Sequence, residues 1–177
     1  MLGLELANRY TREGFASLGL LGEDLCRPLD RDRDGLMLGE ALAGLILSRE
    51  EGPGWRVSGR GWSVDTSGPT AADLSGAPVA AAISEALAHA NCPPEAISLI
   101  KLHGAGSPLT DKAEVAGLRR IFKALPPCVS LKPVIGHTLG ASGIAELNLV
   151  TSCLDLGETP PTAGFRTVAP ALDLAPS

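Results

Sequence analysis

The sequence predicts an α/β fold built in layers, and two observations support this. From about residue 78 onward, segments with helical apolar spacing alternate with short apolar runs in the order helix, strand, helix, strand, helix. That order is typical of a sheet with at least partly parallel strands, covered by helices. The chain has 177 residues, of which 45% are hydrophobic. It can therefore bury a core as one globular domain or as part of a larger one.

The first half of the chain contains fewer clear elements. Residues 27–39 form a charged loop, and the apolar run ALAGLILS follows at 41–48. By its length, that run fits either a buried strand or a short helix, and periodicity alone does not decide between them. Residues 55–65, WRVSGRGWSVD, alternate loosely between apolar and polar side chains. This alternation predicts a strand.

The second half is better defined. Pro78 lies near a helix start and is followed by apolar side chains at helical spacing, which predicts a helix over 78–90. The runs ISLIKL at 97–102 and CVSL at 128–131 predict strands. The segment after the second run has helical spacing up to Gly157, a residue type that commonly ends helices.

A further helix is expected between these two strands. Ser107 and Pro108 are suited to its cap and its first position. Its apolar face carries Val115, Leu118, Ile121 and Phe122.

Composition excludes some classes of function. The formal charge is -5, the pI is near 5.2, and aromatic residues make up 3% of the chain. Without a cluster of Lys and Arg, neither a nucleic-acid groove nor a basic membrane-binding surface is expected. No apolar run approaches the roughly 18 to 20 residues that span a bilayer, and the N-terminal residues lack the order of a signal peptide. A cytoplasmic location is expected.

The cysteines and one acidic loop also bear on metal binding. Cys26, Cys92, Cys128 and Cys153 are widely and irregularly spaced, and we interpret them as reduced packing residues. The loop DRDRDGLMLGE begins like a calcium-binding loop, but its twelfth position is Ala41 where a bidentate acid is required. Calcium binding is not expected.

Two of the three histidines lie in loops, each just after a predicted strand. His103 precedes Gly-Ala-Gly, and His137 lies between Gly136 and a small-residue helix start. Glycines let free backbone N–H groups approach a ligand, and a helix N-terminus disfavours protonation of a nearby imidazole. Each histidine could then donate one hydrogen bond to a developing oxyanion. A purely structural role is the alternative for any single histidine, and we assign it to His89, which lies among alanines.

For three charged residues, the sequence spacing does not decide between a structural and a functional role. Lys132 could be a solvated lysine at a strand end or part of a site. Asp111 and Glu114 lie in the first turns after Pro108, where carboxylates also stabilise a helix electrostatically.

Two long motifs resemble the β-ketoacyl-acyl carrier protein synthase family. IKLHGAGSPLTDKAEVAGLRRIF matches the family's HGT-G/S-T-P-x-x-D-x-x-E pattern, and LKPVIGHTLGASGIAELN matches K-x-x-x-GH-x-x-G-A-x-G. Upstream, GFASLGLL, CRPLDRDRDGLMLGE and SGAPVAAAISEALAHANCPPEAISLI also resemble it, so the similarity covers nearly the whole chain. The resemblance identifies the charged loop with the family's PFD-x-x-x-D-G-x-x-x-GE segment and residues 41–48 with a strand.

The resemblance implies a thiolase-like layered fold, in which two similar βαβαβαββ halves stack as helix, sheet, helix, sheet and helix. Residues 1–54 are then expected to be the end of the N-terminal half, and residues 55–177 a truncated C-terminal half. The fold is expected to be incomplete, without the N-terminal nucleophile region and the final strands. Open sheet edges would favour association of the isolated chain.

The implied activity is acyl transfer by decarboxylative Claisen condensation in fatty-acid or polyketide biosynthesis. An acyl group on a cysteine is attacked by an enolate formed from a malonyl-carrier protein. In that scheme His103 and His137 have catalytic roles and hydrogen-bond the malonyl thioester oxygen. Lys132 and Glu114 are the charged pair that orders the site, and Ser107 contacts the pantetheine arm of the substrate.

The same resemblance implies that no metal or organic cofactor is needed. The expected partners are an acyl carrier protein, malonyl and acyl thioesters, and a second synthase chain in a homo- or heterodimer.

Several residues depart from the family pattern. Ala105 stands where a pantetheine-binding threonine is usual, and Leu131 replaces the usual threonine before Lys132. The nucleophile motif, a cysteine between small residues, is absent, and Cys26 lies where family members often have a non-catalytic cysteine. The chain alone is therefore expected to be inactive.

These departures support a second interpretation, a non-catalytic synthase-like partner similar to a chain-length factor. An unrelated histidine hydrolase ranks third, because no Ser or Cys nucleophile motif accompanies the histidines.

Overall fold

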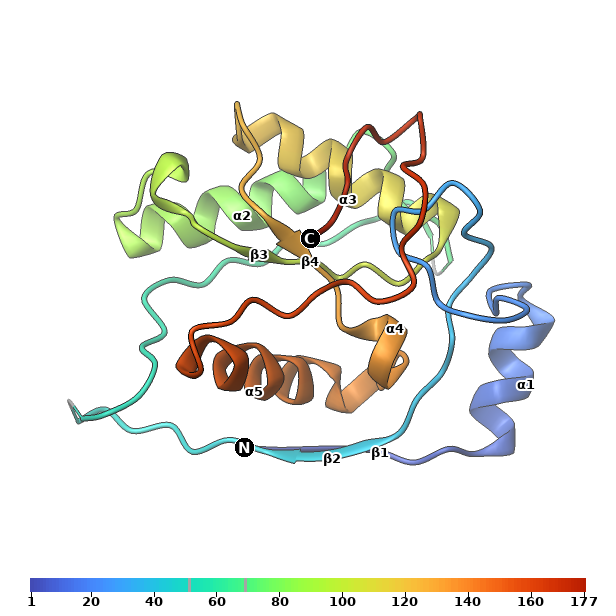
Figure 1. Ribbon diagram of the computed structural model, residues 1–177, viewed down its shortest axis with the longest axis horizontal. Helices are drawn as coiled ribbons and strands as arrows, with labels where there is room; N and C mark the ends of the chain where they lie inside the picture. Colours follow the sequence, from blue (N-terminus) through green and yellow to red (C-terminus); the bar gives the residue numbers. More distant parts are fainter. Residues whose placement is uncertain (51, 69) are drawn as a thin grey trace.

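The computed structural model describes residues 1–50, 52–68 and 70–177 as a stack of helical and sheet layers (Figure 1). The layers are, in order, helices α2 (Ala77–Ala90) and α3 (Pro108–Ile121), strands β3 (Ile100–Lys101) and β4 (Cys128–Val129), helix α5 (Ser142–Asp155), and strands β1 (Leu2–Glu5) and β2 (Ala41–Gly44). The layered α/β architecture predicted from the order of the elements is confirmed.

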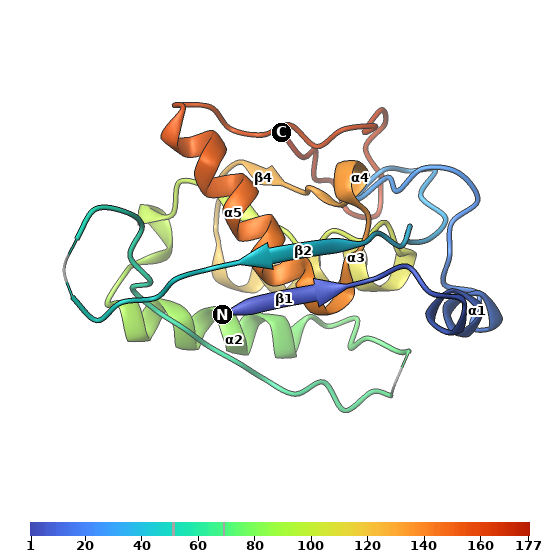
Figure 2. The same cartoon turned by 90° about the horizontal axis from the view of Figure 1, so that it is seen from below.

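Two small sheets lie on either side of α5. β3 and β4 pair in parallel, with Ile100 opposite Cys128, as the alternating element order predicts. β1 and β2 pair antiparallel, with Leu2 opposite Gly44. Helix α5 packs on the face of β1 and β2, and Figure 2 shows it crossing them at an angle. Helix α5 thus lies between the two sheets (Figure 1).

The remaining helical elements are short or peripheral. They are α1 (Arg9–Ser17), α4 (Lys132–Ile135) and two 3₁₀ turns, η1 (Pro94–Ala96) and η2 (Leu139–Ala141). Helix α1 begins at Asn8, whose side chain accepts a hydrogen bond from the Thr11 N–H at 2.9 Å. Neither α1 nor β1 was predicted from the sequence. Helix α1 buries none of its residues.

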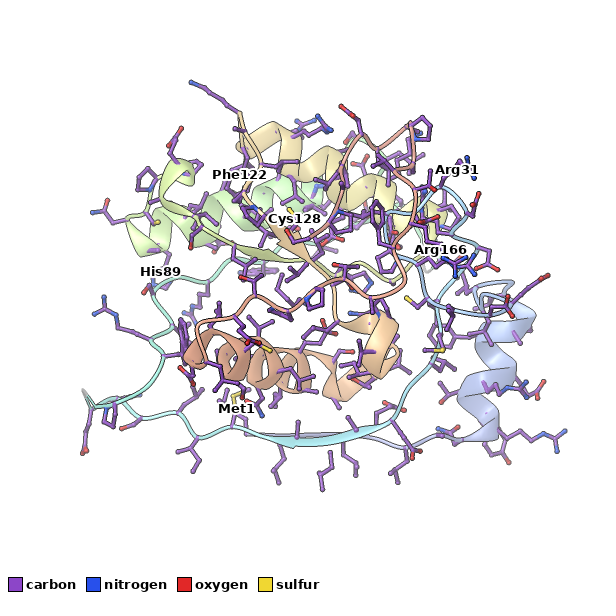
Figure 3. The ribbon with its side chains drawn as sticks, viewed as in Figure 1. Met1, Arg31, His89, Phe122, Cys128 and Arg166 are labelled. Atoms are coloured by element: carbon purple, nitrogen blue, oxygen red, sulfur yellow. The ribbon has the colours of Figure 1, made fainter. Side chains whose placement is uncertain are left out.

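The main core lies between α3, the β3–β4 sheet and the C-terminal segment. Val115 and Leu118 are buried on one face of α3, as their spacing predicts. Phe122, the C-cap of α3, is buried as well, and Ile121 is partly buried against the same core. Phe122 and Cys128, both labelled in Figure 3, are buried in this core. Other members of this core cluster are Leu29, Leu102, Ala169, Leu172 and Leu174.

The strand predicted over residues 55–65 is wrong: this segment is extended but forms no strand. It runs along α2, where Gly59 and Gly61 lie too close to the helix carbonyls for any Cβ to fit. The Trp62 N–H donates to the Glu85 carboxylate at 3.0 Å. Loose alternation favours extended backbone, but a strand also needs a neighbouring strand to complete its ladder.

The other predicted strands form but are shorter. Residues 41–48 contribute only Ala41–Gly44, residues 97–102 only Ile100–Lys101, and residues 128–131 only Cys128–Val129. In the last case Leu131 is already the cap of α4.

All four cysteines are unpaired, and Cys26 and Cys128 are buried, in line with the predicted packing role. Within the described ranges, no helix has the length and apolar character needed to cross a membrane.

Candidate active site

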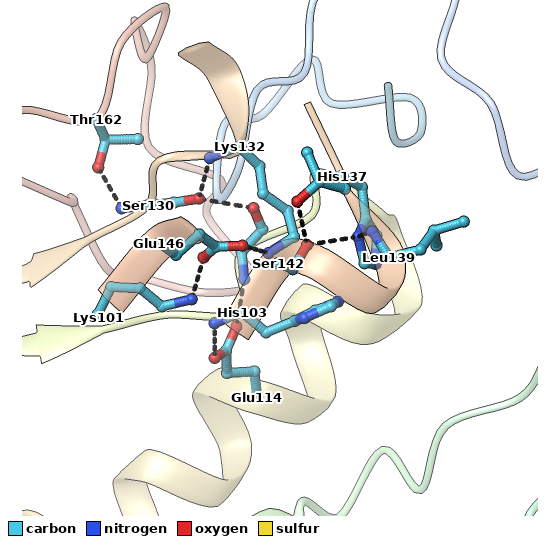
Figure 4. A network of polar contacts seen from close by, with 12 residues as sticks. Lys101, His103, Glu114, Ser130, Lys132, His137, Leu139, Ser142, Glu146 and Thr162 are labelled. Carbon is cyan, nitrogen blue, oxygen red and sulfur yellow. Dashed lines mark hydrogen bonds and ion pairs between the residues drawn. The ribbon is translucent and has the colours of Figure 1, made fainter. Parts of the chain in front are cut away.

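Two loops from different layers bring the histidines of the two motifs together. His103 follows β3, and His137 follows α4 and Gly136. Their ring centroids lie 5.2 Å apart with the planes at 76°, an edge-to-face arrangement. Figure 4 shows the polar network around them. The two residues are far apart in the sequence, and the folding of the chain makes them neighbours.

The backbone of His137 is held on both sides by the segment that precedes β2. The His137 N–H donates to the Met37 carbonyl at 2.6 Å, and its carbonyl accepts from the Gly39 N–H at 3.1 Å. Gly136 has φ +71, and a Cβ there would lie 2.7 Å from the backbone of Gly39. Only glycine permits this close approach without strain.

The ring of His137 has a defined proton position. The main-chain N–H of Leu139 donates to its Nδ1 at 3.2 Å, and the Ser142 Oγ lies 3.3 Å from the same atom. A main-chain N–H can only donate, so Nδ1 is the acceptor and the proton lies on Nε2. His137 is therefore a neutral imidazole with a donor on its Nε2 side.

The turn at His103 is held by two carboxylates of α3. The Glu114 Oε1 accepts the His103 N–H at 2.6 Å, and its Oε2 accepts the Gly104 N–H at 2.9 Å. The Asp111 Oδ1 accepts the Gly106 N–H at 3.2 Å. The expectation that these N–H groups stay free for a ligand is therefore wrong, because acidic side chains of the following helix already bind them.

Asp111 also connects the turn to the charged loop at 27–39. Its Oδ2 accepts the Leu29 N–H at 2.9 Å, and the Arg33 Nε lies 3.7 Å from the same oxygen. Asp111 has no exposed surface, and burial raises its pKa to about 6. The sequence resemblance identified this loop with a family segment, but it did not identify Asp111 as its connection to the His103 turn.

The other side of the turn rests on the end of β4. Gly104 has φ +45, and a Cβ there would lie 2.8 Å from Ser130. The buried Ser130 hydroxyl donates to the Gly104 carbonyl at 2.8 Å, and its N–H donates to the Thr162 hydroxyl at 2.9 Å. The position of the His103 turn is thus determined by β4, α3 and the charged loop together.

A buried charged cluster lies beside the histidines. Glu146 on α5 and Lys132 are each 1% exposed, and the Lys132 Nζ donates to the Glu146 Oε1 at 2.7 Å. Lys101 binds the other carboxylate oxygen, Oε2. The ion-pair partner of Lys132 is thus Glu146, and not the expected Glu114, whose carboxylate is engaged with the His103 turn.

Glu146 and Lys101 were not identified from the sequence. The available signal was Glu146 itself, a single carboxylate inside the apolar helical run that follows His137. A carboxylate in such a run needs a buried partner.

The surroundings favour neutral histidines. Partial burial and the Lys132 ammonium together lower the pKa of His137 to about 4. The pKa of His103 is lowered for the same reasons, although its side chain keeps contact with solvent. Burial by itself raises the pKa of Glu146, but the hydrogen bonds from Lys101 and Lys132 outweigh this and hold it below its usual range.

Neither buried cysteine is suited to be a nucleophile. Burial raises the pKa of Cys26 to about 12, and its Sγ donates to the Ala105 carbonyl at 3.2 Å. Burial also raises the pKa of Cys128, to about 11. Nucleophilic thiols require the opposite shift.

The remaining candidate residues lie as follows. Ser107 occupies the cap position of α3 and is half-buried, without a side-chain capping hydrogen bond. Ala105 and Leu131 are buried. His89 is exposed on α2 (Figure 3). In the part of the chain that the structure describes, no cluster of three His, Cys, Asp or Glu side chains could hold a metal ion.

Comparison with known proteins gives consistent matches. Residues 56–166 match the family model of the β-ketoacyl synthase C-terminal domain. The chain is 33% identical over 158 residues to the tetracenomycin polyketide synthase ketoacyl synthase alpha subunit of Streptomyces glaucescens, covering 84% of this chain and 37% of that protein. It is 32% identical over 148 residues to the polyketide biosynthesis malonyl-ACP decarboxylase PksF of Bacillus subtilis, covering 76% of this chain and 36% of that protein.

A solved structure shows the same fold. The ketosynthase ApeO in complex with its chain length factor ApeC, from Xenorhabdus doucetiae, matches with a TM-score of 0.89 and 37% identity, over 96% of this chain and 43% of that chain. This confirms the thiolase-like layered fold. The chain spans about two fifths of the length of the curated relatives that it matches.

Proposed function

This chain belongs to the β-ketoacyl synthase family, and from that premise we propose that it supplies the enolate-forming half of a condensing site. In the proposed reaction, a malonyl thioester on an acyl carrier protein loses carbon dioxide. The bond between the α-carbon and the carboxylate breaks, and its electron pair forms an enolate with charge on the thioester oxygen. The enolate carbon then attacks the carbonyl of an acyl thioester, a carbon–carbon bond forms, and the carbon–sulfur bond of that thioester breaks with departure of a thiolate.

The observation that carries this proposal is the pair of neutral imidazoles. His103 and His137 meet at 5.2 Å between ring centroids, and the Leu139 N–H leaves the His137 proton on Nε2. Neutral donors held rigidly stabilise charge as it develops on an oxyanion, with little reorganisation at the moment of reaction. We assign both histidines as the catalytic donors to the enolate oxygen.

The other predicted site residues have supporting parts in this proposal. Lys132 orders the site through Glu146, and Glu114 holds the His103 turn. The Ser107 hydroxyl makes no cap hydrogen bond, which leaves it available to the amide groups of a pantetheine arm. The relative named a malonyl-ACP decarboxylase supports the decarboxylation step in particular.

The acyl group must be carried on a thiol elsewhere. Because burial raises the pKa values of both Cys26 and Cys128, we propose that another segment or another chain supplies the nucleophile. The isolated chain would then be inactive in condensation, and it would act in the cytoplasm, paired with a synthase chain. We further propose that residues 1–54 end an N-terminal half and that residues 55–177 belong to a C-terminal half; the family match beginning at residue 56 supports this boundary.

The test is release of carbon dioxide from malonyl-carrier protein by the chain together with its cognate synthase. We expect His137→Ala to lower the rate about 10²- to 10³-fold, the usual effect of removing one oxyanion donor. His89→Ala, an exposed histidine on α2, is the matched control and should leave the rate unchanged. Equal rates of carbon dioxide release for His137→Ala and the unsubstituted chain would contradict the proposal.

A second candidate function is that of a non-catalytic partner similar to a chain length factor. The matched ApeO structure is a ketosynthase bound to such a factor, and Ala105 and Leu131 are buried apolar residues at two positions where the family usually has threonine. This function predicts a stable heterodimer with the cognate synthase by analytical ultracentrifugation. It also predicts that His137→Ala leaves the rate unchanged. A chain that stays monomeric when mixed with the synthase would argue against it.

A further inference from the structure

Lys101 places a second ammonium group on the buried carboxylate of the candidate site. The Glu146 side chain is 1% exposed, and each of its oxygens binds one lysine: Oε1 binds Lys132, and Oε2 binds Lys101. Lys101 reaches Glu146 from β3, where its own side chain is 29% exposed. Figure 4 shows both lysines converging on this carboxylate. One ammonium is sufficient to form an ion pair, so the second one requires its own explanation.

The charges of the neighbouring side chains explain the second ammonium group. Glu114 also lies next to the histidines, and both of its oxygens accept main-chain N–H groups. Burial raises the pKa of Glu114, whereas the two main-chain N–H groups and the nearby lysines favour its ionised form. With Glu114 ionised, the cluster of Lys101, Lys132, Glu114 and Glu146 holds two carboxylates and two ammonium groups, whose charges cancel. Without Lys101, it would carry one net negative charge beside two imidazoles.

We propose that Lys101 is a positioning residue that balances the second carboxylate of this cluster and so keeps His103 and His137 in the neutral, hydrogen-bond-donating form. The proposal rests on the proposed function for its importance to catalysis, because a neutral imidazole is what the enolate requires. The charged groups that face the two histidines are Lys101 from β3, Glu114 from α3, Lys132 at the start of α4, Glu146 from α5 and, on the His137 side, Glu5 from β1.

The expected effect of losing Lys101 follows from the sign of the charges. An excess negative charge favours the imidazolium form and raises the pKa of each histidine. An imidazolium carries a proton on Nδ1, which would then face the donating N–H of Leu139. The hydrogen bond that orients His137 would be lost in the same step. Lys101 would therefore act on both the charge and the direction of the donor.

The test is an NMR titration of the two histidine rings in the full chain, which needs no substrate. We expect Lys101→Met to raise the titration midpoints of His103 and His137 by about one pH unit, and Lys101→Arg to leave them within a few tenths. Lys123→Met, an exposed lysine beyond the end of α3, is the matched control. The double variant Lys101→Met/Glu146→Gln restores the charge balance and should return the midpoints toward their original values.

A role in packing alone predicts the opposite for the double variant, because removing a second side chain can only disturb the site further. No shift with Lys101→Met, or the same shift with Lys101→Arg, would overturn the proposal. If Lys101→Met does not fold, Lys101→Gln removes the same charge and tests the proposal in its place. The unsubstituted chain provides a further test, because both of its histidines must titrate below 6.5. If Lys101→Met shifts the histidine midpoints but no decarboxylation is measured, only the proposed function is contradicted. If decarboxylation is measured but Lys101→Met leaves the midpoints unshifted, only the role of Lys101 is contradicted.

Discussion

The main-chain N–H of Leu139 donates a hydrogen bond to the Nδ1 of His137 at 3.2 Å. This contact is what makes His137 a donor through Nε2, since a main-chain N–H cannot accept. Leu139 belongs to the 3₁₀ turn η2 that leads into α5, so the start of the helix and the proton position of the histidine are determined together. Neutrality of the imidazole is a property of the local backbone as much as of the charges around it.

The first prediction concerns stability and pH. Because the pKa of His137 is lowered from 6.5 to about 4, the unfolded chain takes up a proton before the folded chain as the pH falls. The free energy of unfolding should therefore decrease between about pH 6.5 and pH 4. We expect His137→Gln to remove on the order of 1 to 2 kcal/mol of this decrease, after allowance for screening by solvent.

Urea denaturation at several pH values measures this difference. Asp111, whose pKa is raised to about 6 by burial, has the opposite sign: its contribution is present at low pH and is lost as the pH rises through about 6. Comparing the two proteins at each pH cancels that contribution. Parallel curves for the unsubstituted chain and His137→Gln would contradict the prediction.

The second prediction concerns Gly136. A Cβ at this position would lie 2.7 Å from Gly39, and the φ of +71 strains any other residue. We expect Gly136→Ala to cost about 2 to 4 kcal/mol of stability. It should also abolish decarboxylation, because it displaces His137.

Gly143→Ala is the matched control for that change. Gly143 lies in the first turn of α5, and its Cβ would meet nothing within 4 Å. Alanine favours helix over glycine by about 0.5 to 1 kcal/mol, so a small gain in thermal stability is expected. If both variants behave alike, close approach to Gly39 does not position His137.

The third prediction concerns the buried ion pair. Lys132→Met leaves the Glu146 Oε1 without its ammonium partner in a site with 1% exposure. We expect a loss of about 2 to 4 kcal/mol by chemical denaturation, somewhat moderated because Lys101 still binds Oε2. The comparison is Arg12→Met, which removes an exposed ion pair with Glu13 and should change little. Equal effects of the two substitutions would mean that the Glu146 carboxylate is solvated in the folded chain.

The fourth prediction concerns thiol reactivity. Because burial raises the pKa values of Cys26 and Cys128 to about 12 and about 11, both should resist iodoacetamide at pH 8 in the folded chain. Cys92 and Cys153 are only partly buried and should react first. Mass spectrometry of peptides after brief labelling distinguishes the four sites. Fast modification of Cys26 would identify it as a candidate nucleophile and would contradict its assignment as a packing residue.

Several parts of the fold and of the site could be predicted from local patterns. Helical spacing predicted α2, α3 and the long helix after His137, and the order of elements predicted the parallel pair of β3 and β4. The motif resemblance predicted that His103 and His137 share one site, and their ring centroids lie 5.2 Å apart. These features depend on residues close together in sequence or on motifs long enough to define a family.

Other parts could not be predicted, because they depend on partners that are distant in sequence. Residues 55–65 have strand-like alternation but lie on α2 without a pairing strand. The N–H groups of the His103 turn looked free, yet Glu114 and Asp111 bind them.

The sequence by itself determined the layered α/β class, the family and the two histidines, because periodicity and motif spacing are local properties of the chain. Only the tertiary structure decided that Lys132 pairs with Glu146, that Lys101 joins them, and that Leu139 sets the proton of His137. The physical reason is that a buried charge or an imidazole proton is controlled by whichever groups folding places within a few ångströms. Those groups come here from β3, α4, η2 and α5.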